Sequence, residues 1–244
     1  MDPTNAVVLV TGASSGIGAA TARAASHAGA RVVLLARREH RIRELATELG
    51  GEALAISCDV TDRAQVEAAV RAAINTYGRI DVLINSAGQG LQARTEELDP
   101  ADLRAVLELN LVAVLVTMQA VLPTMQAQGS GTVVNISSGI TFADLPGSAG
   151  YSASKAALEK LTSIAREELA DAGIAVSLMI PWITSTEFST SVLGDVAGAQ
   201  ELEASSGFEP DTPEDVAAAI LDLIRSGASR ADLVPVEAGG TLRS

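Results

Sequence analysis

The stretch Thr11-Gly12-Ala13-Ser14-Ser15-Gly16-Ile17-Gly18 (TGASSGIG, 11–18) separates an apolar run at 6–11 from a helical pattern at 16–29. Its three glycines allow the backbone to turn tightly and allow a pyrophosphate to approach the start of the helix. Free N–H groups and the helix dipole at that position favour anions. Because glycines after a strand can also form a simple turn, the prediction of a dinucleotide site depends on the strand–turn–helix context.

The same stretch contains a second pattern, because residues 12–16 fit G-x-S-x-G, the nucleophile turn of α/β-hydrolases. That mechanism needs a histidine base later in the chain. The only histidines are His27 and His40, and none follows them, so the hydrolase interpretation is excluded. The same scarcity of histidine, together with a single cysteine, provides no set of zinc ligands, and no metal is expected.

Outward from this turn, short apolar runs alternate with longer amphipathic ones along the chain. We expect strands at 6–11, 31–36, 53–57, 81–85, 132–137, 175–181 and 232–236. We expect helices near 16–29, 39–49, 62–77, 100–127, 151–172 and 213–226. Continuous Val, Leu and Ile runs are typical of strands buried on both faces of a parallel sheet. The alternation predicts a doubly wound (Rossmann-type) α/β fold with a seven-stranded, mostly parallel sheet and helices on both faces.

No repeat, low-complexity tract or linker divides the chain, so residues 1–244 are expected to form a single domain. Three helix starts are marked by polar residues and proline, at Thr61-Asp62, Asp99-Pro100 and Thr212-Pro213-Glu214. Residues 182–212 form the one long irregular segment in this interpretation. Because a long loop within a compact domain is usually functional, we expect this segment to be a substrate loop or lid.

Composition excludes several classes of partner. The net charge of −13 argues against nucleic acid or an anionic membrane surface as a ligand. The N-terminal sequence has no basic region typical of a secretory signal, and the longest apolar stretch, around 111–123, is too short to span a bilayer. The single cysteine, Cys58, is compatible with a reducing compartment. We therefore expect a soluble, cytoplasmic protein.

The end of the second predicted strand indicates which nicotinamide cofactor is preferred. An NAD site usually places an acidic residue here to bind the ribose 2′-hydroxyl. This chain instead has Ala36 followed by Arg37 and Arg38. A guanidinium group can bind a 2′-phosphate through two hydrogen bonds, whereas a carboxylate would repel it. The sequence therefore favours NADP(H). The alternative is that the two arginines are solvated residues capping a loop, and the nearby acidic Glu39 argues mildly against a phosphate site.

A second short stretch, YSASKAAL at 151–158, places one of the two tyrosines four residues before one of the two lysines. In a helix, Tyr151 and Lys155 share a face. A phenol has an ordinary pKa of about 10, which a neighbouring ammonium group can lower. The pairing can also be accidental, so the rest of the chain has to decide whether Tyr151 is a proton-transfer site with Lys155 as the stabilising charge.

With these residues in order, the chain resembles the short-chain dehydrogenase/reductase family along nearly its whole length. TGASSGIG resembles the family's TGxxxGxG turn, and NSAG at 85–88 is similar to its NNAG. Tyr151 and Lys155 match the YxxxK motif, and Ser138 stands 13 residues before Tyr151, the familiar separation. Asn110 and Asp59 match the family's catalytic asparagine and its adenine-contacting acid.

The resemblance implies hydride transfer between a nicotinamide and a carbonyl or secondary alcohol. It implies that Tyr151 is the general acid/base, that Ser138 binds the substrate oxygen, and that Lys155 binds the nicotinamide ribose. Asn110 would anchor a water that links Lys155 to solvent. The expected cofactor-binding residues are Gly12, Ser14, Ser15, Gly16, Ile17, Gly18, Arg37, Arg38, Asp59, Val60, Asn85, Ala87, Gly88, Tyr151, Lys155, Pro181, Ile183 and Thr186.

The chain departs from the family pattern at two positions. Ser86 replaces the second asparagine of NNAG, and Trp182 follows Pro181 where the family usually has glycine. Trp182 either walls the substrate pocket or packs under the long loop, and the sequence does not decide between them. Residues 184–211 contain no basic residue and several acidic ones, which disfavours a strongly anionic substrate and an acyl-carrier-protein partner. We expect a moderately apolar small molecule.

Two other functions remain open on the same fold. One is a nucleotide-sensing regulator that binds the cofactor without turnover, although such proteins commonly lose the tyrosine or lysine retained here. The other is a lyase or epimerase, which no feature of the sequence requires. The apolar and small-residue faces of the helices near 100–127 and 151–172, which relatives pair, predict a homodimer or homotetramer.

Overall fold

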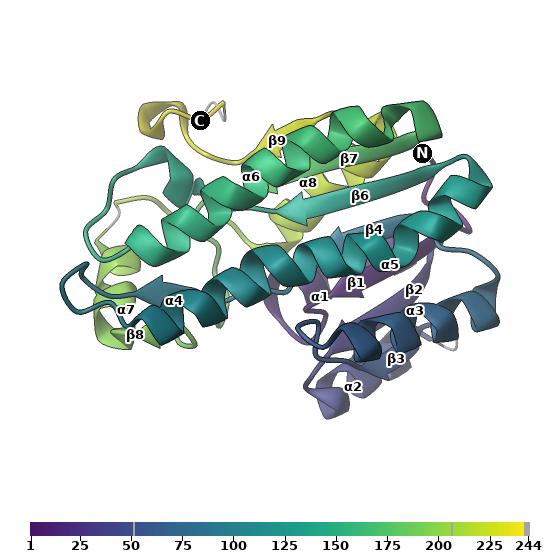
Figure 1. Cartoon of the computed structure of the whole chain (residues 1–244), viewed down its shortest axis with the longest axis horizontal. Coiled ribbons are helices and arrows are strands. Elements are labelled where there is room, and N and C mark those ends of the chain that lie inside the picture. Colours follow the sequence, from purple (N-terminus) through teal and green to yellow (C-terminus); the bar gives the residue numbers. More distant parts are fainter. Residues whose placement is uncertain (51, 206, 242–244) are drawn as a thin grey trace.

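Seven of the apolar runs form one parallel sheet in the order β3-β2-β1-β4-β6-β7-β9 (Figure 1). The computed structural model describes residues 1–50, 52–205 and 207–241. Within them the sheet strands are β1 (Val7–Thr11), β2 (Arg31–Ala36), β3 (Leu54–Ser57), β4 (Val82–Asn85), β6 (Gly131–Ile136), β7 (Ile174–Ile180) and β9 (Arg230–Asp232). The chain builds outward from β1 on one side and from β4 on the other. Ligands of such sheets bind outside the carboxyl ends of the strands at this switch point.

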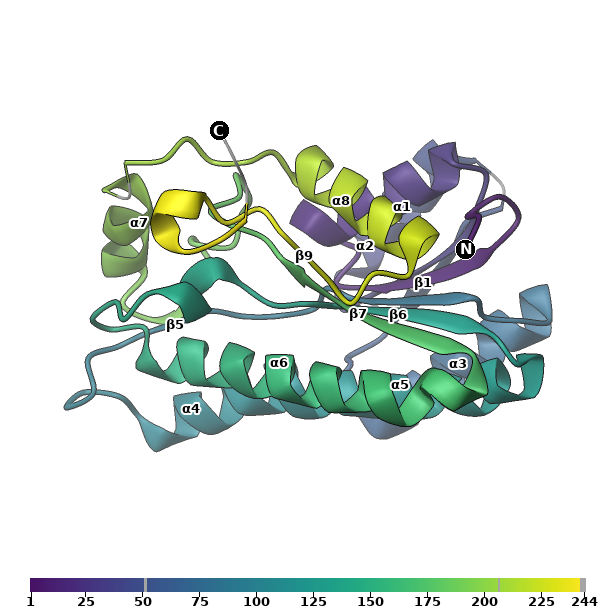
Figure 2. The same ribbon diagram turned by 90° about the horizontal axis from the view of Figure 1, so that it is seen from above.

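Helices cover both faces of the sheet, as the sequence predicts (Figure 2). One layer contains α1 (Gly16–His27), α2 (Glu39–Leu49) and α8 (Pro213–Ser226), and the other contains α3 (Arg63–Tyr77), α4 (Pro100–Leu107), α5 (Ala113–Gln128) and α6 (Ala149–Leu169). Along β1, Val8 and Val10 pack into the first layer, whereas Val7 and Leu9 pack into the second. Both faces of the strand are therefore buried, which explains its unbroken apolar run.

The three predicted helix starts are confirmed. The carboxylate of Asp62 accepts hydrogen bonds from the N–H groups of Ala64 and Gln65 at the start of α3. Asp99 caps α4 in the same way, with Pro100 in the first turn. Thr212 and Asp215 form a reciprocal capping box at the start of α8. These side chains satisfy backbone donors that have no partner inside the helix.

The predicted helix at 100–127 is interrupted by a π-helical turn, η1 (Glu108–Val112), between α4 and α5. The combined run Pro100–Gln128 is long and apolar enough by composition to cross a membrane, a property that core helices of soluble proteins share. Here it lies along the sheet, with α3 and α6 as neighbours (Figures 1 and 2).

Two sequence predictions at the C-terminal half are wrong. The last strand is β9 at Arg230–Asp232 rather than 232–236, because β7 ends at Ile180 and Pro235 has no N–H for a ladder. The segment 182–212 is not irregular throughout: β8 (Leu193–Gly194) pairs with β5 (Leu91–Gln92), and α7 spans Val196–Ala204. Ser206 of this segment lies outside the described residues. Because α7 buries none of its residues, it has no apolar stripe to reveal it.

Candidate active site

A cavity of about 990 Å³ opens at the carboxyl ends of the strands, between the glycine turn and the 182–212 segment. Most of the predicted site residues line it, namely Gly12, Ser14, Ser15, Gly16, Ile17, Arg37, Arg38, Asp59, Val60, Ala87, Gly88, Ser138, Tyr151, Lys155, Pro181, Ile183 and Thr186. Gly18, Asn85 and Asn110 are not among the lining residues. The structure therefore brings residues from seven parts of the chain together in one cleft.

The glycine turn has the geometry that a bound pyrophosphate needs. Gly12 and Gly16 have φ angles of +68° and +51°, which favour glycine. A Cβ at Gly12 would lie 2.8 Å from the backbone nitrogen of Ala87, and one at Gly18 would lie 2.5 Å from the carbonyl oxygen of Gly12. Ser15, at the N-cap of α1, makes no side-chain cap to the first turn. The helix start thus keeps N–H donors for an anion, and a dinucleotide phosphate fits it.

The NSAG turn is tied to the glycine turn by Thr11. Its Oγ1 accepts hydrogen bonds from the N–H groups of Ser86 and Ala87, both at 3.1 Å. Asn85, expected among the cofactor residues, has its side chain in the interior instead. It accepts from Thr117 at 2.7 Å and donates to Asn135 at 2.9 Å. Its amide therefore holds β4, β6 and α5 together beneath the cavity rather than facing a ligand.

The consecutive residues Arg37 and Arg38 differ in their contacts. Arg38 donates from Nε to Ser14 Oγ at 3.0 Å and from Nη2 to Ser15 Oγ at 2.5 Å. Its Nη1 reaches Glu187 of the 182–212 segment at 3.1 Å, and Arg41 contacts the same carboxylate at 2.8 Å. Arg37 lines the cavity and is exposed. Glu187 was missed by sequence reasoning because its partners lie almost 150 residues earlier in the chain.

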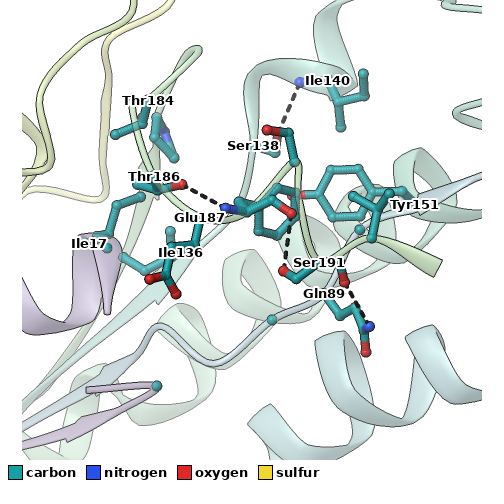
Figure 3. Close-up of a pocket in the computed structure, with 18 of the residues that line it drawn as sticks. Ile17, Gln89, Ile136, Ser138, Ile140, Tyr151, Thr184, Thr186, Glu187 and Ser191 are labelled. Carbon is teal, nitrogen blue, oxygen red and sulfur yellow. Dashed lines mark hydrogen bonds between the residues drawn. The ribbon is translucent and has the colours of Figure 1, made fainter. Parts of the chain in front are cut away.

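Tyr151, Lys155 and Ser138 meet at the wall of the cavity formed by α6 and the end of β6. Lys155 is only 5% exposed; its Nζ donates to the carbonyl of Ile136 at 2.9 Å and lies 5.9 Å from the centroid of the Tyr151 ring. Ser138 Oγ accepts from the N–H of Ile140 at 3.3 Å, and Figure 3 shows it beside Tyr151. This places a phenol, a hydroxyl and a buried cation around one position.

The prediction that Lys155 lowers the pKa of Tyr151 is wrong for this state of the protein. Burial raises the pKa of Tyr151 to about 12, and the hydrogen bond with Ser138 only partly opposes that rise. Burial also lowers the pKa of Lys155 to about 8, against the opposing charge of Glu159. Desolvation disfavours the charged form of each group and is the largest cause of both pKa shifts. Tyr151 is therefore a protonated acid at neutral pH.

Asn110 lies in the π-helical turn and is fully buried. Its Oδ1 accepts from the N–H of Gln89, and its Nδ2 donates to the carbonyl of Gln89, both at 2.9 Å. It therefore fixes the backbone that follows Gly88, close to Lys155. Single π-helical turns occur frequently at functional sites. In this sequence, the signal for the turn is one asparagine within an apolar helical stretch.

Described residues of the 182–212 segment, here called the lid, line the cavity. The Phe188 ring lies 5.5 Å from the Tyr151 ring, and a side chain at Gly90 would collide with Phe188 and Val192. Gln89 Nε2 donates to the carbonyl of Ser191 at 3.0 Å, a bond drawn in Figure 3. With the β5–β8 pair, these contacts hold the lid against the residues that follow β4.

Trp182 has both of the roles that the sequence left open. It lines the cavity, and its ring fills the space where a side chain at Gly139 would stand. It also packs edge-on against Phe208 of the lid at 5.6 Å. Among the described residues, its buried Nε1 has no hydrogen-bond partner.

Comparison with known proteins agrees with this geometry. The family model described as short chain dehydrogenase matches residues 6–196. The chain is 34% identical over 200 residues to an uncharacterized oxidoreductase of Staphylococcus epidermidis, covering 82% of this chain and 86% of that protein.

Two solved structures are similar over almost the whole chain. One is a short-chain dehydrogenase/reductase from Burkholderia phymatum in complex with NAD, with a TM-score of 0.90 and 25% identity over 97% of this chain and 91% of that one. The other is the closed form of serine dehydrogenase with NADP+, with a TM-score of 0.87 and 28% identity over 95% of both chains. The chain therefore belongs to the short-chain dehydrogenase/reductase family of NAD(P)-dependent oxidoreductases.

Proposed function

We propose that the chain transfers hydride between NADP(H) and a moderately apolar carbonyl or secondary alcohol, with Tyr151 as the general acid/base. The observation that carries this proposal is the meeting of Tyr151, Ser138 and the buried Lys155 at one wall of the cavity. The glycine turn lies in the same cleft, where it can hold the cofactor phosphates. The cofactor and the acid can thus act on one substrate.

For reduction, a nicotinamide cofactor held in this cleft would supply the hydride that the carbonyl carbon accepts. Ser138 donates a hydrogen bond to the carbonyl oxygen, and Tyr151 transfers its phenolic proton to that oxygen, which yields the alcohol. The tyrosinate that remains is stabilised by the Lys155 ammonium and is later reprotonated from solvent. Because the pKa of Tyr151 is raised to about 12, the proton is in place at every physiological pH.

The preference for NADP(H) is supported by Arg38 rather than by the similar proteins, since one of those was solved with NAD and another with NADP+. Arg38 lies across Ser14 and Ser15, at the edge of the glycine turn. Its third contact is the Glu187 carboxylate, and this contact with an anionic group supports the proposal. A ribose 2′-phosphate would bind there in place of the carboxylate.

Arg38→Ala is expected to weaken NADPH binding about 10- to 100-fold, because a hydrogen bond to a charged group contributes about 1.5–3 kcal/mol. NADH binding should change little, since NADH has no 2′-phosphate. Fluorescence titration of both cofactors measures the effect, and Arg37→Ala tests the neighbouring guanidinium. Equal losses for NADPH and NADH in Arg38→Ala would contradict the assignment.

The substrate end of the cavity is mostly apolar. Tyr151, Phe188, Trp182 and Phe208 supply aromatic walls, with Leu145 and Leu202 beside them. Such walls favour a ketone, aldehyde or secondary alcohol that has an apolar body. No lysine, arginine or histidine occurs in residues 184–211 to bind a strongly anionic group.

The proposed function is tested by following NADPH and NADH oxidation across ketones, aldehydes and diketones of graded size. We expect turnover with NADPH on apolar carbonyls, and slower turnover with NADH. Turnover that prefers NADH would overturn the cofactor proposal. Tight cofactor binding without turnover on any carbonyl or alcohol would instead support a nucleotide sensor.

We also propose that the chain forms a homodimer or homotetramer through α5 and α6, which run side by side on one face of the molecule (Figure 1). Leu115 and Ile164 are 38% and 45% exposed on these helices, and Val112 lies nearby in sequence. Light scattering is expected to give a dimer or tetramer mass, and Ile164→Glu to shift it toward the monomer. A monomer mass for the unmodified chain at micromolar concentration would refute the proposal.

A further inference from the structure

Glu159 lies one helical turn beyond Lys155 and two beyond Tyr151, so that the three side chains share one face of α6. Its Oε1 accepts a hydrogen bond from Ser137 Oγ and another from Thr141 Oγ1, each at 2.8 Å. Ser137 is the residue before Ser138, and Thr141 lies in the short 3₁₀ helix that follows it. A single carboxylate thus binds the side-chain hydroxyls of two residues that flank Ser138 in the chain.

These contacts matter because Ser138 and Tyr151 belong to different elements. Ser138 Oγ accepts a long bond, 3.3 Å, from the N–H of Ile140 and is also hydrogen-bonded to Tyr151. Apart from that direct bond, two other contacts join α6 to the same segment, from Ser152 to Ile140 and from Lys155 to Ile136. The Glu159 bonds involve an ionised acceptor, and such bonds are about twice as strong as neutral ones. Among these links, those made by Glu159 reach residues on both sides of Ser138.

Glu159 also provides the charge that faces Lys155. Around the ammonium lie Tyr151 and Glu159 of α6, the Ile136 carbonyl of β6, and Gly88 with Asn110 on the opposite side. Within the described residues, Glu159 is the one charged group whose field acts on the Lys155 pKa, and it raises that pKa against the lowering by burial. Removing the charge should therefore release the Lys155 proton at lower pH.

We propose that Glu159 is a positioning residue: its carboxylate locks the Ser138 segment onto the Tyr151–Lys155 face of α6 and places a negative charge behind Lys155. The inference rests on the proposed function, because it assigns Glu159 to the same proton-transfer site. It predicts that the carboxylate acts through Ser138 and Lys155 without touching the substrate.

Glu159→Gln keeps the size of the side chain and removes its charge. Compared with Glu167→Gln, an exposed glutamate on the same helix, it is expected to lower the pKa of Lys155 by roughly one unit. In turnover assays, kcat should fall about tenfold with little change in KM, and the alkaline limb of the kcat profile should move to lower pH by the same amount. Ser137→Ala with Thr141→Val should lower kcat without moving that limb.

The pKa can be measured without activity. The chain has two lysines, so a protein labelled at lysine Cε gives two NMR resonances, and the exposed Lys160 is the internal reference. A lower Lys155 pKa in Glu159→Gln supports the inference about Glu159, whether or not a substrate is turned over. Failure to turn over any substrate counts against the proposed function alone. Equal Lys155 pKa values in Glu159→Gln and Glu167→Gln would overturn the inference about Glu159. Should Glu159→Gln fail to fold, Glu159→Asp keeps the charge with a shorter reach and should lower kcat at an unchanged pKa.

Discussion

Tyr151→Phe is expected to lower kcat by about 10²- to 10⁴-fold, the usual contribution of a positioned acid or base. The substitution removes one oxygen and leaves the ring, so the contact with Phe188 and the fold of α6 should persist. NADPH affinity should change by less than about threefold, because the arginine and glycine-turn contacts are untouched. A fall in kcat without a rise in KM is the signature of an interaction made in the transition state.

The chain supplies a matched control, because its other tyrosine is Tyr77. The Tyr77 hydroxyl donates to the carbonyl of Glu52 at 2.7 Å, far from the cavity. Tyr77→Phe should therefore keep full turnover while making the same chemical change. If Tyr151→Phe turned over carbonyl substrates as fast as Tyr77→Phe, Tyr151 would not be the proton donor.

Local patterns in the sequence determine much of this fold. The sheet, the two helical layers and the three capped helix starts are confirmed because each depends on residues within a few positions of one another. The glycine turn belongs to the same class. Gly12 packs against the backbone of Ala87, and Gly18 packs against the carbonyl group of Gly12. A Cβ at either position would collide with these backbone atoms, so only glycine fits.

The parts that the sequence could not predict depend on distant partners. Glu187 and Arg38 are far apart in the chain, and the β5–β8 pair contains only two residues in each strand. The sign of the Tyr151 pKa shift also needed the structure, because burial rather than the nearby lysine decides it. The cofactor preference and the roles of the site residues stay predictions.

Lys155→Met is expected to lower kcat at least about 100-fold and, at pH 7, to make the protein more stable. Activity should fall because the tyrosinate formed after proton transfer loses its stabilising charge. Stability should rise because a buried ammonium is unfavourable in the folded state. The fall of the Lys155 pKa from 10.5 to about 8 corresponds to about 3 kcal/mol at pH 7. Loss of the bond to the Ile136 carbonyl offsets part of this gain.

The pH dependence separates this effect from a general change in packing. Between pH 8 and 10.5 the unfolded chain binds more protons at Lys155 than the folded one, so the free energy of unfolding of the unmodified protein rises across that window. Lys155→Met lacks the proton and should show no such rise. Its advantage should be largest below pH 8 and disappear near pH 10.5. Urea unfolding at pH 6, 7 and 10, with the exposed Lys160→Met as the control, measures this difference. A stability difference that is the same at pH 6 and pH 10 would show that the ammonium is not the unfavourable group.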